Sequence, residues 1–239
     1  MNPRLSVCLL VLALHAGPLR AQEALGAAGT PLSGELLSTF VTIGMLSLVP
    51  VFLICCTCLT FSLIVFSICR QAIGLQQSPP NLVLISISLA LTYFVMAPEF
   101  ETAWAAGIAP FLDGSLALAE AAERTAAPFR AFMAAHTEEG ITRMLRETVA
   151  RNQDRPPESV SDFPLMVTAF LLSEISRAFL VGFFLIVPFL VIDLVVAAIL
   201  MSMGMMMVPP AVVSLPFKLA FFVVANGWAM LTGSIISRY

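Results

Sequence analysis

Charged residues are scarce in this sequence. Asp, Glu, Lys and Arg make up 11% of its 239 residues, against roughly 25% in a soluble domain, and 59% of the residues are hydrophobic. A water-soluble globule with so little charge would leave apolar surface facing water, so lipid or other subunits must cover much of the molecule. The formal net charge of −3 offers no attraction to nucleic-acid phosphates. We therefore expect a membrane-associated protein with no nucleic-acid partner.

Lysine and histidine are rarer still. Lys218 is the single lysine, and His15 and His136 are the two histidines. Because Lys218 follows a phenylalanine, the sequence has no Gly-Lys-Ser/Thr phosphate loop, which excludes ATP hydrolysis by this motif. A histidine-based triad or a zinc site would need almost all of its groups from carboxylates and thiols. We expect no enzymatic activity, no cofactor and no metal.

Cysteine is confined to the first third of the chain. The five cysteines are Cys8, Cys55, Cys56, Cys58 and Cys69. The polar middle of the chain therefore cannot contain a disulfide, even if it is exported. The cluster at residues 55–58 lies in a charge-free apolar stretch, so small buried packing residues are favoured over a metal or redox site.

Residues 1–21 have the pattern of a secretory signal peptide. Arg4 precedes an apolar run over residues 5–14, and Ala21 offers a small residue for cleavage. The run is too short to cross a hydrocarbon layer of about 30 Å, although an uncleaved anchor is the alternative. A cleaved signal would place the new N-terminus on the outer face of the membrane.

The rest of the chain predicts an all-α protein with two kinked helical hairpins that flank a small helical region. The first hairpin, residues 22–98, has an uncharged stretch at 36–69 with Pro50 near its first bend, a polar turn at 70–81, and a second apolar segment. Residues 99–163 are acidic and helical, and Pro128 is predicted to open a short helix. A linker is expected at 152–164. Arg70 on the first turn favours a cytoplasmic tip and places the acidic region outside.

The second hairpin, residues 164–239, contains prolines at 188, 209, 210 and 216, which predict breaks in its helices. The charges within its apolar segments are Glu174, Arg177, Asp193 and Lys218. Charges in apolar segments need partners or water. Glu174 and Arg177 are three residues apart and could pair on one helix, whereas Asp193 and Lys218 could meet the other hairpin arm or a neighbouring subunit. A packing ion pair is favoured over a proton relay.

Five of the twelve methionines fall within residues 201–207. Methionine is unbranched and polarizable, so it fills irregular gaps and repacks around changing partners. Gly204 on one side and Pro209 and Pro210 on the other predict a loop rather than a continuous helix. Such a loop could close a pore by excluding water, or it could be ordinary core filling.

Together these segments resemble the FliP family, the flagellar members of the type III secretion export-gate proteins. The resembling stretches are Arg70-Gln71-Ala72-Ile73-Gly74-Leu75-Gln76-Gln77-Ser78-Pro79-Pro80-Asn81, Ser173-Glu174 through Pro188-Phe189-Leu190-Val191-Ile192-Asp193, Leu200-Met201-Ser202-Met203-Gly204-Met205-Met206-Met207-Val208-Pro209-Pro210, Ser214-Leu215-Pro216-Phe217-Lys218 and Gly227-Trp228. The likeness covers most of residues 36–237, in order.

The resemblance implies a helical ring of copies of this chain, with five subunits, that works with FliQ-, FliR- and FlhB-like subunits in the bacterial inner membrane and on its periplasmic side, within the flagellar basal body. Unfolded flagellar proteins would pass through its centre. Met205, Met206 and Met207 would form the sealing gasket, and Glu174 would pair with Lys218 of an adjacent subunit.

Two other hypotheses remain open at this stage. The first is an ion- or solute-coupled secondary transporter that uses Glu174, Asp193 and Lys218. The second is a structural basal-body scaffold with no conduit.

Overall fold

The computed structural model describes residues 34–75, 78–152, 162–205 and 207–239, and all regular structure in these residues is helical. The chain divides into two compact units, 1–49 and 50–239. In the first unit, the described residues belong to helix α3 (Gly34–Cys56), which continues into the second unit. The predicted signal peptide and Met206 lie outside the described residues. The predicted all-α class is confirmed for the described part of the chain.

A sharp bend separates α3 from the helix that follows it. The segment Pro50–Cys56 of α3 meets α4 (Leu59–Ile73) at 79°. The sequence predicted a bend near Pro50, but Pro50 lies inside α3. The bend falls at Thr57 and Cys58, so that prediction is wrong. The side chain of Thr57 donates a hydrogen bond to the carbonyl of Leu53, and both residues of the bend are buried.

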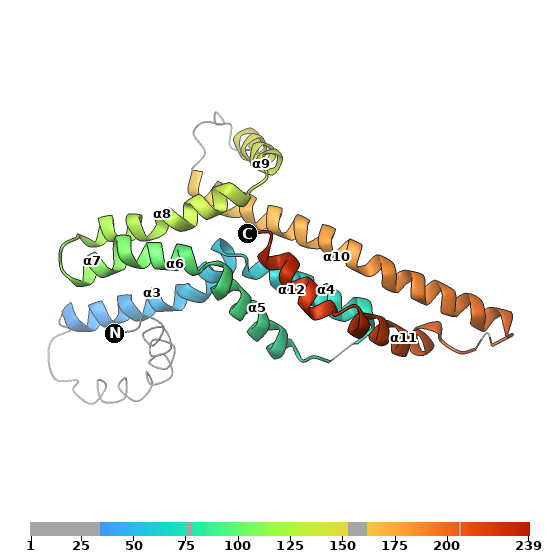
Figure 1. Ribbon diagram of the computed structural model, residues 1–239. Helices are drawn as coiled ribbons and strands as arrows, with labels where there is room; N and C mark the ends of the chain where they lie inside the picture. Colours follow the sequence, from blue (N-terminus) through green and yellow to red (C-terminus); the bar gives the residue numbers. More distant parts are fainter. Residues whose placement is uncertain (1–33, 76–77, 153–161, 206) are drawn as a thin grey trace. The chain divides into compact units, whose positions relative to one another are not determined.

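Helices α4 and α5 (Asn81–Val95), both labelled in Figure 1, pack against each other. Gly74 ends α4 with a left-handed φ of +92°, which an L-residue rarely adopts. Arg70 Nη1 donates to Asn81 Oδ1 at 2.5 Å and to the carbonyl of Pro79 at 3.3 Å. Arg70 was predicted to lie on the polar turn, but it belongs to α4. Its side chain links the two ends of that turn.

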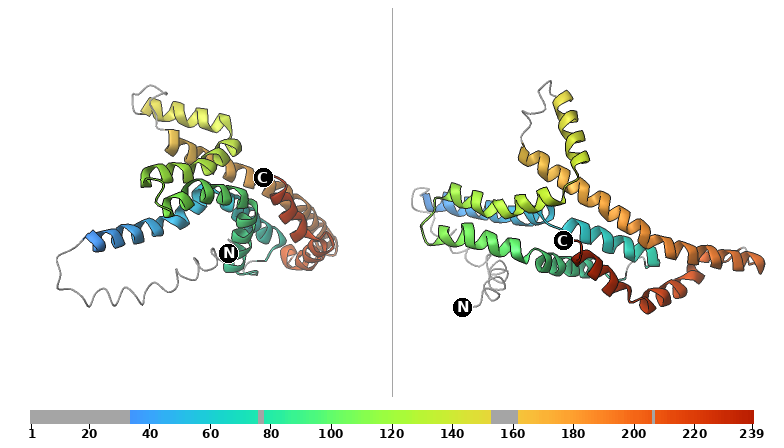
Figure 2. Two further views of the ribbon diagram at one scale, coloured as in Figure 1. Left: turned by 60° about the vertical axis from the view of Figure 1, so that its left-hand side comes forward. Right: turned by 45° about the horizontal axis from the view of Figure 1, so that its top comes forward.

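The middle of the chain is a run of short helices packed on a longer one. These are α6 (Ala97–Ala103), a π-helical segment η1 (Trp104–Ile108), α7 (Ala109–Leu112), α8 (Leu118–His136) and α9 (Glu139–Asn152). Figure 2 shows α6 and α8 side by side. A Cβ at Gly107 would lie 2.1 Å from Thr125 Oγ1 of α8, so the close approach of η1 requires glycine. Pro128 lies inside α8, and the prediction that it opens a helix is wrong.

The last third of the chain consists of α10 (Asp162–Ser202), α11 (Pro210–Val224) and α12 (Gly227–Ile236). α10 continues through Pro188, and α11 continues through Pro216, so neither proline makes the predicted break. A proline in a helix removes one backbone hydrogen bond, and that loss is tolerated where neighbouring packing holds the helix. Phe189 supplies such packing, since its ring lies 5.9 Å from that of Phe221 and 6.4 Å from that of Phe222.

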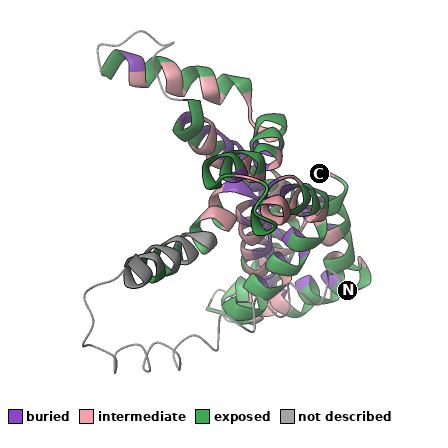
Figure 3. Ribbon diagram, turned by 90° about the vertical axis from the view of Figure 1, so that its left-hand side faces the viewer, coloured by how far each residue is buried: buried purple, intermediate pink, exposed green. Residues whose placement is uncertain are grey.

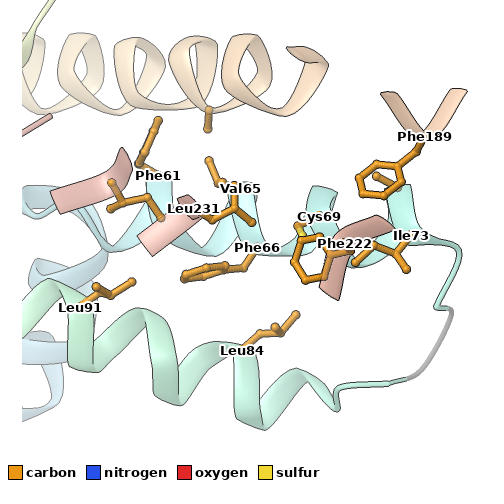
Figure 4. Close-up of a cluster of buried hydrophobic side chains, with 13 residues drawn as sticks. Phe61, Val65, Phe66, Cys69, Ile73, Leu84, Leu91, Phe189, Phe222 and Leu231 are labelled. Carbon is orange, nitrogen blue, oxygen red and sulfur yellow. The ribbon is translucent and has the colours of Figure 1, made fainter. Parts of the chain in front are cut away.

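Two apolar clusters form the interior of the second unit. The first joins α4 and α5 to α10, α11 and α12, and Figure 4 shows it. Its buried members are Phe61, Val65, Phe66, Cys69, Ala72, Ile73, Leu84, Leu91, Ala178, Phe189, Phe222, Leu231 and Ile235. The second contains Cys56, Cys58, Met96, Ala103, Phe129, Phe132, Met133 and Phe170. Cys56 and Cys58 lie in apolar packing, as the sequence predicts for the cluster at residues 55–58, whereas Cys55 is only partly buried. Cys69 is buried in the first cluster.

Many residues of the helices are exposed (Figure 3), and a large number of the exposed residues are hydrophobic. In α10, for example, Phe184 and Leu194 are 66% and 67% exposed. Monomeric soluble proteins rarely show apolar patches of this extent. By length and composition, α10 is able to cross a membrane, and the described residues contain up to four candidate spans if each of three bent helix pairs counts as one. The expectation from composition, a membrane-associated protein, is thus supported by a helix long and apolar enough to cross a membrane.

Candidate functional site

The methionine-rich loop connects α10 to α11. Gly204 has φ +74°, and the backbone N–H of Met205 donates to the carbonyl of Leu200 at 3.0 Å, which closes the end of α10. Pro209 is extended and Pro210 begins α11. The break that Gly204 and the two prolines predict is therefore confirmed. We call residues 203–209 the methionine loop.

The described methionines of this loop are exposed. Met203 is 65% exposed, Met205 38% and Met207 97%. These methionines do not fill the core of the chain, which removes the core-filling interpretation for Met207 and weakens it for Met205. An exposed apolar loop of flexible side chains is suited to closing on a partner or on itself across a passage.

A polar cluster links the two helices that carry the loop. Asp193 of α10 accepts a hydrogen bond from Ser214 Oγ at 2.5 Å on Oδ1 and from Lys218 Nζ at 2.6 Å on Oδ2. Lys218 Nζ also donates to the carbonyl of Ala72 in α4, at 3.3 Å. Ser214 and Lys218 are buried. The sequence left two kinds of partner open for Lys218, a residue of the other hairpin arm or a residue of a neighbouring subunit. Within the chain, Lys218 pairs with Asp193 of the other arm.

A second charged cluster surrounds Glu174, which is 0% exposed. Its carboxylate accepts a hydrogen bond from the hydroxyl of Tyr239 and lies 3.6 Å from Arg238 Nη2 and 3.8 Å from Arg177 Nη1. The predicted Glu174–Arg177 pair is present at this longer distance. Among the described residues, Glu174 Oε1 has no hydrogen-bond partner.

Arg177 also connects α10 to the turn between α8 and α9. Its guanidinium lies 3.1 Å from Glu138 Oε1 and donates to the carbonyl of His136 at 2.8 Å. Ser173, which precedes Glu174, accepts a hydrogen bond from the Glu138 N–H at 3.0 Å. Arg177 therefore holds the acidic middle region onto the helix that carries Glu174.

Sequence reasoning missed Arg238 and Tyr239. The Tyr239 ring packs on Phe132 at 5.7 Å and on His136 at 5.0 Å, and the Arg238 guanidinium lies 4.2 Å from the ring centroid of Phe61. Burial and then the Glu174 carboxylate raise the pKa of the Tyr239 hydroxyl. The signal in the sequence was the pair Arg238-Tyr239, a cation and an aromatic residue directly after an apolar segment. Both residue types can partner a buried carboxylate such as that of Glu174.

Glu174 and Lys218 do not contact each other within the chain, since each has other partners. A pair between them stays a prediction about two copies. Among the described residues, no group of three or more His, Cys, Asp or Glu side chains is arranged to hold a metal ion. The site therefore consists of an exposed methionine loop and two charge clusters, one around the buried Lys218, whose partner Asp193 has a side chain that is 40% exposed, and one around the buried Glu174.

These features define a class: an all-helical protein with a helix able to cross a membrane, large exposed apolar faces and buried charges that tie its helices together. The sequence matches the FliP family over residues 42–235, so the chain belongs to the FliP family. It is 42% identical to a flagellar biosynthetic protein FliP of Agrobacterium fabrum, over 85% of this chain and 84% of the relative. The FliP of Caulobacter vibrioides is 47% identical over 82% of this chain and 73% of its own, and that of Bacillus subtilis is 41% identical over 81% and 87%.

Proposed function

We propose that this chain is a pore-forming core subunit of the flagellar type III protein export gate, through which unfolded flagellar proteins pass during flagellum assembly. Family membership supports the flagellar role. The observation that supports the pore is the methionine loop, which is apolar, exposed and bounded by Gly204 and Pro209. In this proposal Met205, Met206 and Met207 form the seal, and the chain has no enzymatic activity.

We propose further that several copies, five by the resemblance, form a ring in the inner membrane and on its periplasmic side, together with FliQ-, FliR- and FlhB-like subunits. The exposed apolar faces of α10 support this assembly, because lipid or neighbouring protomers must cover them. The acidic residues 99–163 would then lie on the periplasmic side. This arrangement places the subunit in the flagellar basal body.

The proposed pair between Glu174 and Lys218 of adjacent subunits has a structural requirement. Glu174 is covered by Arg238 and Tyr239, so a neighbour's lysine reaches it only if those two residues move. An ammonium group has three donors, and the described residues accept two of those of Lys218. Lys218 can thus keep Asp193 while it binds a second carboxylate.

The decisive experiment replaces Met205, Met206 and Met207 by alanine in the complete export complex. We expect the complex to assemble and to leak small ions, because the apolar plug has lost its bulk. Met230→Ala is the matched control, since Met230 is 67% exposed but lies on α12, outside the loop. An assembled triple variant that is as tight as the wild type would contradict the proposed seal.

A charge-swap experiment tests the intersubunit pair and the transporter alternative together. Lys218→Glu is expected to prevent oligomer formation, and combination with Glu174→Lys is expected to restore part of it. If both single variants assemble normally but lose ion-coupled solute uptake, the transporter hypothesis is supported instead. A cleft of about 520 Å³ lies elsewhere, and Glu174, Asp193 and Lys218 are not among its lining residues. It is lined by Ala134, Thr137, Glu139, Thr142, Arg143, Arg146, Asp162, Leu165 and Met166.

A further inference from the structure

The position of the methionine loop must be set by the helices on either side of it. Met203 and Met207 are 65% and 97% exposed, so the loop has little packing of its own. α10 and α11 pack against each other, and Figure 2 shows them diverging from the loop. Any change in how these two helices are aligned therefore moves the loop.

Asp193, Ser214 and Lys218 form what we call the arm clasp. Among the described residues, the two hydrogen bonds that Asp193 accepts are the only hydrogen bonds between α10 and α11. They use both carboxylate oxygens, so the carboxylate cannot rotate without breaking one of them. The bond from Lys218 to the carbonyl of Ala72 attaches the clasp to α4 as well.

The clasp lies between the aromatic anchor of the two helices and the loop. Phe189 contacts Phe221 one helical turn further from the loop than Asp193. On the loop side, Ser214 follows Pro210 by four residues, about 6 Å of helix, and Asp193 precedes Ser202 by nine, about 13 Å. Among the described residues, no hydrogen bond joins α10 and α11 on the loop side of the clasp.

We infer that Asp193 and Ser214 are positioning residues of the gate: the clasp fixes the rotation of α11 on α10 and so holds the methionine loop in its sealing position. This inference rests on the proposed function. Loss of one clasp bond leaves the aromatic anchor and the intersubunit surfaces in place, so the ring still assembles. The loop then samples positions that do not seal.

The test compares Ser214→Ala with Ser202→Ala in the complete export complex. Ser202 is the matched control because it is nearer to the loop, but its hydroxyl donates to the carbonyl of Ile199 in its own helix. Assembly is measured by the mass of the purified complex, and the seal is measured by ion leak from vesicles that contain it. We expect Ser214→Ala to assemble and to leak at least threefold more than the wild type, and Ser202→Ala to match the wild type.

Asp193→Asn is the second variant, because it removes the ionic bond with little change in volume. It is expected to leak as well, and addition of Ser214→Ala to the triple methionine variant is expected to give no further leak, because both act on the same seal. An assembled Ser214→Ala complex that is tight overturns the inference. So does failure of both clasp variants to assemble, since the clasp would then sustain the fold and not the loop. If the triple methionine variant itself is tight, the proposed function fails instead.

Discussion

The contact between α4 and α10 depends on a glycine, and its replacement gives a sharp test of the packing. Gly182 is buried in α10, against Ile68 of α4. A Cβ at position 182 would lie 2.5 Å from Ile68 Cδ1, 2.9 Å from Cγ2 and 3.3 Å from Cβ. Contacts below 3.0 Å force a shift, and the Cγ2 contact is the harder to relieve because χ1 of isoleucine is stiff.

The expected magnitude is a balance of two effects. Overpacking of one methyl group costs about 1–3 kcal/mol, whereas alanine is favoured over glycine in a helix by about 1 kcal/mol. The stiff Ile68 side chain places Gly182→Ala in the upper part of that range, so we expect a net loss of about 1–2 kcal/mol. For a chain of this size, such a loss lowers the unfolding midpoint by roughly 2–8 °C.

The assay is thermal unfolding of the purified protein in micelles, followed by tryptophan fluorescence, because the Trp228 ring packs on Phe66 of α4, the helix that carries Ile68. In an Ile68→Ala background the clash disappears, and Gly182→Ala is expected to become neutral or stabilising. Gly233→Ala is the control, since a Cβ there meets nothing within 4 Å. If Gly182→Ala leaves the midpoint unchanged in both backgrounds, α4 and α10 do not approach this closely and the reasoning is refuted.

Two further predictions concern Gly204, in the methionine loop, and Tyr239, after α12. Gly204→Ala has open space around it, so its cost is the left-handed backbone alone, about 1–2 kcal/mol, and we expect increased ion leak from the assembled complex; Gly140→Ala, equally open but with no positive φ, should leave the seal unchanged. The folded protein holds the Tyr239 hydroxyl protonated, because its pKa is raised above the unfolded value of about 10. The unfolded state therefore releases this proton first as pH rises above about 10, and stability falls; Tyr239→Phe should make the alkaline fall in unfolding midpoint shallower, and an unchanged slope would contradict this linkage.

Local signals in the sequence predicted the methionine loop well. Gly204 and Pro209 act through their own backbone dihedrals, which do not depend on distant residues. The same local reasoning failed at Pro188, where α10 continues because Phe189 packs on rings of α11. Whether a proline breaks a helix thus depends on tertiary contacts that no local pattern contains.

The charged residues show the same division. Apolar surroundings made it certain that Asp193 and Lys218 need partners, and they partner each other. The sequence could not select that pairing, because it depends on the alignment of α10 with α11. The role of Tyr239 was missed for a stronger reason: its hydrogen bond to Glu174 joins residues 65 positions apart, and it requires the residue after α12 to lie against α8 and α10.

The scarcity of lysine makes the arm clasp directly observable. Lys218 carries the only side-chain amine of the sequence, and it is 7% exposed with two acceptors on its ammonium group. An amine-acylating reagent can modify that nitrogen only when the helices separate and the proton leaves. The labelling rate at Lys218 therefore reports how often α11 separates from α10 and α4. It can be followed by mass spectrometry without an engineered probe.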